Sequence, residues 1–155
     1  MERPTTFGTW EATVPSDITA DAVWKIEAYR LGLFLADLAW FDASNLLEER
    51  RSRRIADQLV RSAGSISANI EEGYSHRTGK DRARFYTYAL GSARETRGWY
   101  FKGRHVFSSE VTAHRLDLTT QIIRLLLTMI PDQRRRNYMV EEEAVVYRTN
   151  AEIPY

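Results

Sequence analysis

DQLVRSAGSISANIEEG, residues 57–73, is the stretch of sequence that decides the predicted fold. Its apolar and small residues recur at spacings of three and four, which places them on one face of an α-helix. Between residues 62 and 68 that face is built from alanine, glycine and serine, so a neighbouring helix can approach closely. Close packing would offset the roughly 0.5–1 kcal/mol that Gly64 costs in a helix interior.

Two residues of this stretch carry separate expectations. Asn69 lies on or near the thin face, where a buried amide must find partners, so we expect it to form a hydrogen bond to a neighbouring helix. Gly73 is expected just past the end of the helix, because glycine adopts the left-handed conformation without strain.

Helical periodicity on both sides of this stretch predicts three further helices. One runs from about residue 18 to about Ala43, one opens at Thr78 or Asp81, and one begins near residues 108–110 and ends at Pro131. The predicted core line of the third helix is Phe85, Tyr88, Ala89, Ser92, Thr96 and Trp99, and its small patch at residues 91–93 is expected to face residues 63–68. Four helices joined by short turns predict an all-α, up-down-up-down four-helix bundle.

We place the bundle at residues 18–131, flanked by two segments. Residues 1–17 contain Pro4, Gly8 and Pro15 and are expected to form an extended arm, which Phe7 and Trp10 could dock. Residues 132–155 combine arginines, glutamates and a short apolar run. This appendage could be a disordered tail, an edge strand or a strap across a neighbouring subunit, and the strap is preferred because its apolar side chains would otherwise be exposed.

Length and composition are those of one ordinary globular domain. The chain has 155 residues, of which 43% are hydrophobic and 28% charged. It contains no cysteine, which excludes disulfides, thiol catalysis and cysteine-ligated metal sites. No apolar run approaches the ~18 residues of a membrane span, and no secretory signal precedes the bundle, so we expect a cytoplasmic protein without membrane contact.

A family resemblance rests on two blocks of residues. The first contains residues 57–59, 65–73 and Arg77, and the second contains Phe85, Ala89, residues 91–92 and Glu95. In order and spacing they resemble the four-helix bundle family encoded by intervening sequences of 23S ribosomal RNA genes, from about residue 23 to residue 130. The motif residues that the resemblance marks are Asn69, Gly73, Gly91, Ser92 and Glu95.

That family is related to the accessory variability determinant of diversity-generating retroelements. The resemblance therefore implies a basic, ring-shaped homo-oligomer, expected to be a homopentamer, that binds RNA or DNA and has a reverse transcriptase as a second partner. For the plain family no activity is implied.

The net charge of +1 conceals an uneven distribution of charged residues. Residues 1–48 carry three basic and eight acidic side chains, whereas residues 77–104 carry eight basic and two acidic ones. Arginine supplies 19 of the 22 basic side chains, and its guanidinium binds phosphate with two donors and stacks on bases. The segregation predicts a surface with acidic and basic zones.

The candidate nucleic-acid-binding residues are Arg77, Lys80, Arg84, Arg94 and Arg97. Tyr86, Tyr88 and Tyr100 lie between them, and basic residues interleaved with aromatic ones suit single-stranded RNA or DNA. The alternative interpretation places the tyrosines in the core and the arginines in salt bridges between helices or subunits.

No stretch has the arrangement of a catalytic site. No histidine follows a glutamate by three residues, as a di-iron bundle would require. The pairs Glu72–His76 and Glu110–His114 could each share a metal, but solvent-facing pairs are the simpler interpretation. We therefore predict a non-enzymatic protein with no cofactor and no metal.

Two functions follow from these observations. In the first, the protein is a homo-oligomeric nucleic-acid-binding accessory protein, which could aid a reverse transcriptase. In the second, it is an oligomeric protein-interaction scaffold that binds no nucleic acid, and its arginines pair with the acidic first third of a neighbouring subunit.

Overall fold

The computed structural model describes residue 4 and residues 6–136, and every regular element in that part of the chain is helical, as predicted for an all-α protein. The elements are α1 (Phe7–Glu11), α2 (Ser16–Thr19), the 3-10 helix η1 (Ala22–Lys25), α3 (Glu27–Glu48), the 3-10 helix η2 (Arg50–Ser52), α4 (Arg53–Ser75), α5 (Gly79–Gly103) and α6 (Ser109–Arg135).

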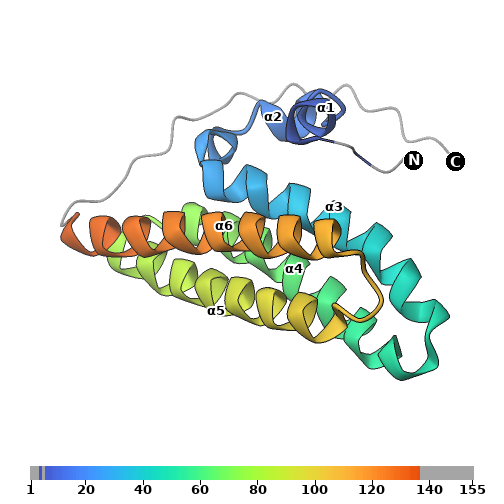
Figure 1. Cartoon of the computed structure of the whole chain (residues 1–155). Coiled ribbons are helices and arrows are strands. Elements are labelled where there is room, and N and C mark those ends of the chain that lie inside the picture. Colours follow the sequence, from blue (N-terminus) through green and yellow to red (C-terminus); the bar gives the residue numbers. More distant parts are fainter. Residues whose placement is uncertain (1–3, 5, 137–155) are drawn as a thin grey trace, which may run out of the picture.

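The four long helices α3 to α6 lie side by side, and the short helices α1 and α2 rest over the beginning of α3 (Figure 1). Helix α4 packs between α3 and α5, and α6 packs against α5 and α3. Along the contact between α4 and α5 the residue order is reversed: Ser62 of α4 meets Thr96 of α5, and Ser65 meets Ser92. Helices α4 and α5 are therefore antiparallel.

The N-terminal segment differs from the extended arm that was expected at residues 1–17. Thr6 caps α1, because its hydroxyl accepts the Thr9 backbone N–H while the Thr9 hydroxyl accepts the Thr6 N–H. Trp10 is buried against Phe34, with ring centroids 5.3 Å apart, and its indole N–H donates to Asp37 Oδ2 at 2.6 Å. The segment docks through Trp10 as expected, but as a capped helical turn.

The first and second long helices have different limits from those predicted. Helix α3 starts at Glu27, later than the expected residue 18, because α2 and η1 come first, and it continues past Ala43 to Glu48. Helix α4 continues past Gly73 to Ser75, and no described glycine has a positive φ. The expectation that Gly73 follows the helix end is therefore corrected.

Gly73 has a packing role instead. A Cβ at this position would lie 2.9 Å from the Cβ of Phe85 and 2.9 Å from Cε1 of Tyr86, both on α5. The glycine thus permits the close approach of α4 and α5 at this end of the bundle.

Helix α6 also continues beyond its predicted end, because Pro131 lies inside it and the helix runs to Arg135. Its last turn packs against Gly79, the first residue of α5, where an added Cβ would overlap the backbone oxygen of Gln133. Residues 132–135 therefore belong to the bundle and not to the predicted appendage. Residues 137–155, which hold the rest of that appendage, lie outside the described residues.

The buried face of α5 is rotated from the predicted core line by about one residue. Its buried side chains are Arg82, Ala83, Tyr86, Ala89, Leu90, Ala93, Thr96 and Tyr100. Phe85, Ser92 and Trp99 are only half-buried, and Tyr88 is exposed. Two of the three tyrosines considered for base stacking, Tyr86 and Tyr100, are therefore core residues.

A buried ion pair joins three of the long helices. Arg115 of α6 donates from Nε to Asp42 Oδ2 of α3 at 2.7 Å, and the Tyr100 hydroxyl of α5 donates to the same oxygen at 3.1 Å. Burial and the Asp42 charge raise the pKa of Tyr100 well above its usual value. Burial, followed by the neighbouring Arg115, lowers the pKa of His114, whose Nδ1 lies 2.8 Å from Arg115 Nη1.

Candidate nucleic-acid interface

A surface cavity of about 550 Å³ lies between the start of α5 and the end of α6. The side chains that line it are Lys80, Asp81, Arg84, Thr87, Tyr88 and Arg134. Lys80, Arg84 and Tyr88 follow each other at intervals of four residues, so they share one face of α5. Arg134 comes from the last turn of α6, which the Gly79 contact holds beside the start of α5.

The charge of the cavity is mainly positive. Lys80, Arg84 and Arg134 are exposed, and within the described part of the chain none of them forms a salt bridge. Asp81 supplies the opposing charge: its carboxylate accepts the Thr78 hydroxyl at 2.6 Å, which holds its pKa below the usual value. Three cations thus face one carboxylate.

Aromatic contacts support the cavity from the side of α5. Tyr88 is 52% exposed and meets Phe85 edge-on, with centroids 5.7 Å apart. Phe85 stacks on His76 at 4.7 Å, and the Arg84 guanidinium lies 5.2 Å from the Phe85 ring centroid. The ring of Tyr88 is therefore positioned by its neighbours while one part of it stays open to solvent.

The structure brings together two of the five predicted site residues, Lys80 and Arg84. Arg77 is exposed in the turn before α5. Arg94 is exposed on α5, about 15 Å beyond Arg84 along the helix axis. Arg97 is half-buried and donates to Thr120 Oγ1 of α6 at 3.3 Å, so part of its hydrogen-bonding capacity serves the α5–α6 contact.

Arg134 was missed because the prediction ended the fourth helix at Pro131. The buried apolar line of Ile122, Leu126 and Ile130 stops before that proline, and Arg134 itself is exposed, so the apolar periodicity carried no signal for the extra turn.

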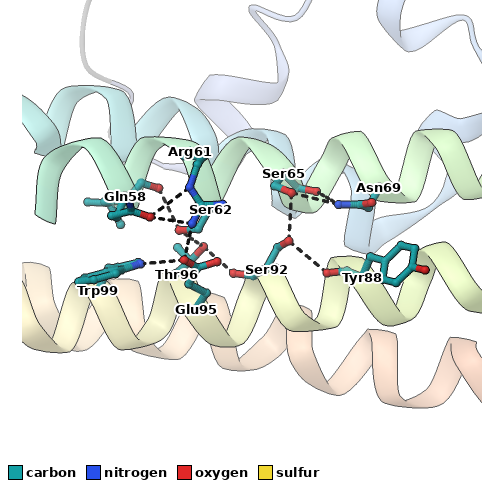
Figure 2. A network of polar contacts seen from close by, with 11 residues as sticks. Gln58, Arg61, Ser62, Ser65, Asn69, Tyr88, Ser92, Glu95, Thr96 and Trp99 are labelled. Atoms are coloured by element: carbon teal, nitrogen blue, oxygen red, sulfur yellow. Dashed lines mark hydrogen bonds and ion pairs between the residues drawn. The ribbon is translucent and has the colours of Figure 1, made fainter. Parts of the chain in front are cut away.

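Three of the motif residues, Asn69, Ser92 and Glu95, lie along a polar contact between α4 and α5, shown in Figure 2. The Ser92 hydroxyl is hydrogen-bonded to that of Ser65 at 3.1 Å, and the Thr96 hydroxyl to that of Ser62 at 2.9 Å. The expectation that residues 91–93 face residues 63–68 is met at Ser92 and Ser65, and the contact continues through Thr96 and Ser62, just outside those two patches. Gly64 and Gly91 stand outside the contact, because a Cβ at either would meet nothing within 4 Å.

Asn69 differs from its predicted role. Its Nδ2 donates to the backbone oxygen of Ser65 at 2.8 Å and to the Ser65 hydroxyl at 3.0 Å, so both bonds stay within α4. The amide is half-buried and reaches α5 only indirectly, through Ser65 and Ser92. The predicted helix-to-helix bond of Asn69 is therefore wrong.

Glu95 closes the same contact toward the end of α5 (Figure 2). It pairs with Arg61 of α4 and accepts the indole N–H of Trp99 at 3.2 Å. The Lys102 ammonium in turn lies 4.0 Å from the Trp99 ring centroid. Glu95 thus organises a cation and an aromatic ring at the end of α5 distant from the cavity.

A second, apolar cavity of about 450 Å³ lies between α3 and α4. Its lining residues are Trp40, Ala43, Ser44, Leu47, Ala56, Asp57, Val60 and Arg61. Trp40 is 68% exposed and Leu47 is 48% exposed, so two large apolar side chains of this cavity face solvent.

Across residue 4 and residues 6–136, no group of three or more histidine, aspartate and glutamate side chains is placed to hold a metal ion. Of the two Glu–His pairs considered as metal ligands, Glu72 and His76 lie close together, with His76 Nε2 3.4 Å from Glu72 Oε1. None of the helices described here combines the length and apolar character of a membrane span.

Comparison with known proteins identifies a family and a solved structure of similar fold. The profile of the 23S rRNA-intervening sequence protein family matches residues 25–128. A crystal structure of a protein of unknown function from the S23 ribosomal protein family of Bacteroides thetaiotaomicron superposes with a TM-score of 0.62 and 25% sequence identity. The match covers 66% of this chain and 97% of that one. No curated protein matches the chain.

Proposed function

The chain belongs to the 23S rRNA-intervening sequence protein family, and from this premise we propose that it is a non-enzymatic, homo-oligomeric protein that binds RNA or DNA. The observation that carries the proposal is the convergence of Lys80, Arg84 and Arg134 on one cavity. Phosphate contacts from lysine and arginine supply most of the affinity of sequence-independent nucleic-acid binding. RNA is the first ligand to test, because the name of the family refers to a ribosomal RNA.

The proposed assembly is an up-down-up-down bundle repeated in a ring, with five copies as the resemblance implies. The apolar cavity around Trp40 and Leu47 supports self-association, since exposed apolar patches of this kind often mark interfaces. A ring would display one basic cavity per copy. Its role would be that of an accessory protein, with a reverse transcriptase as a candidate protein partner.

Binding of a fluorescein-labelled RNA, measured by anisotropy between 50 and 300 mM salt, tests the proposal. Affinity should fall steeply with salt, and each cation removed should lower the slope of log K against log salt by about 0.7 for a single strand. Arg84→Ala and Arg134→Ala should each have this effect. Arg54→Ala, which removes an exposed arginine of α4 outside the cavity, is the matched control and should change the slope little.

An oligomeric scaffold without nucleic-acid binding is the second candidate, favoured by the exposed Trp40. It predicts that the wild-type protein binds no RNA even at low salt and that salt instead dissociates the oligomer. Light scattering with and without RNA separates the two functions. A mass that is independent of RNA at every salt concentration would overturn the nucleic-acid proposal.

A further inference from the structure

We propose that the cavity between α5 and α6 binds one nucleotide of an unpaired strand, with the phosphate at Lys80, Arg84 and Arg134 and the base on the ring of Tyr88. This inference rests on the proposed nucleic-acid binding and specifies the form of nucleic acid that the same site accepts. A flat basic surface would bind duplex and single strand through their phosphates alone, whereas this site combines cations with an aromatic ring in a hollow.

The size of the cavity suits a single nucleotide. Its volume of about 550 Å³ lies within the roughly 300–1,000 Å³ typical of small-molecule sites. A duplex keeps its bases stacked inside the helix, so only its backbone could reach the rim. An unpaired base can leave the stack and enter, which is how most sequence-tolerant single-strand sites work.

Tyr88 has the properties of a stacking platform. The Tyr88 side chain is 52% exposed, so its ring is not part of the core, whereas nearby Tyr86 is buried. Phe85 contacts Tyr88 edge-on, and Phe85 is itself held between His76 and Arg84. Because these contacts limit the motion of the ring before a ligand arrives, little conformational entropy would be lost on binding.

The charges inside the cavity orient the nucleotide. The Asp81 carboxylate repels phosphate and accepts hydrogen bonds, so it favours the donor groups of a base edge. Lys80 and Arg84 from α5 and Arg134 from α6 supply the phosphate contacts. Because Arg134 comes from the other helix, the intact last turn of α6 is part of the site.

Anisotropy titrations with an unstructured ten-nucleotide RNA and with a ten-base-pair RNA duplex test the inference on the full chain. Tyr88→Ala should weaken binding of the single strand on the order of tenfold and leave duplex binding unchanged, because stacking is lost and the cations remain. Tyr88→Phe, which keeps the ring, should bind the single strand within about twofold of wild type. Phe101→Ala removes another exposed ring of α5 and should change neither affinity.

The possible outcomes separate the inference from the function on which it rests. If wild type binds neither RNA, the proposed function fails and the nucleotide site fails with it. If wild type binds RNA but Tyr88→Ala weakens neither form, or weakens both equally, the nucleotide site is overturned while nucleic-acid binding stands. Circular dichroism of each variant checks the fold, which an exposed side chain such as Tyr88 should not disturb.

Discussion

Asp42 of α3 and Arg115 of α6 form an ion pair in the interior of the bundle, with Nε and Oδ2 2.7 Å apart and the aspartate fully buried. The two residues are 73 positions apart in the chain. Tyr100 binds the same carboxylate, so one anion holds the relative positions of α3, α5 and α6.

Removing one member of this pair should destabilise the protein strongly. Arg115→Met removes the guanidinium that pairs with the buried Asp42 carboxylate, and we expect the free energy of unfolding to fall by about 3–5 kcal/mol. Urea denaturation followed by circular dichroism measures this loss.

The double variant Asp42→Leu with Arg115→Met is the control. It removes both charges, so a large part of the lost stability should return. A double variant less stable than Arg115→Met would contradict the view that the buried Asp42 charge causes the loss once Arg115 is removed.

Gly73 and Gly64 lie on the same helix but should respond oppositely to alanine. At Gly73 the new methyl group would meet Phe85 and Tyr86 at 2.9 Å, so Gly73→Ala should cost about 1–3 kcal/mol through overpacking. At Gly64 the methyl group meets nothing within 4 Å, so Gly64→Ala should stabilise α4 by about 0.5–1 kcal/mol. Thermal unfolding of both variants checks the signs, and a stabilising Gly73→Ala would argue against the close contact.

Stability at alkaline pH should depend on Tyr86. Burial raises the pKa of Tyr86 from 10.0 to about 12, so in that interval the unfolded chain loses the phenol proton while the folded chain keeps it. The free energy of unfolding should therefore fall as pH rises above 10, by about 2–3 kcal/mol over the whole interval. Urea midpoints measured from pH 9 to 11 should fall less steeply for Tyr86→Phe.

Tyr88→Phe is the matched control, because it removes the hydroxyl of an exposed tyrosine on the same helix. Its midpoints should fall with pH as those of wild type do. Equal slopes for Tyr86→Phe and wild type would show that the Tyr86 proton does not contribute.

Self-association should depend on the apolar cavity between α3 and α4. Trp40→Glu replaces an exposed aromatic residue of this cavity with a charged one and should shift the protein toward monomer in light scattering. Phe101→Glu introduces the same charge on α5, away from that cavity, and should leave the mass unchanged. If Trp40→Glu retains the wild-type mass, the interface lies elsewhere.

Local periodicity predicted the all-α fold class but not which face of each helix is buried. Phe85, Tyr86 and Tyr88 are all aromatic, so their sequence alone does not say which of them points into the core. The choice depends on Gly73, twelve residues before Phe85, whose missing side chain makes room for Tyr86. The Asp42–Arg115 pair was likewise beyond prediction, because nothing local links two charges on different helices.

Only the part of the candidate site that lies on a single helix could be predicted from the sequence. Lys80 and Arg84 share a helix, and their spacing reveals a common face. Arg134 joins them only because α6 continues through Pro131, which a rule based on proline as a helix terminator does not anticipate. The family resemblance predicted the all-α fold correctly. It did not predict the role of each motif residue, because that role depends on contacts between helices.

The close contact at Gly79 has a consequence for how the chain can evolve. A buried leucine can often exchange for methionine or isoleucine when its neighbours repack, but any residue larger than glycine at position 79 would collide with the backbone of α6. Backbone cannot rotate away as a side chain can. In a saturation library selected for folded protein, this first residue of α5 should tolerate fewer replacements than the leucines of the core, so position 79 should change little as the chain evolves.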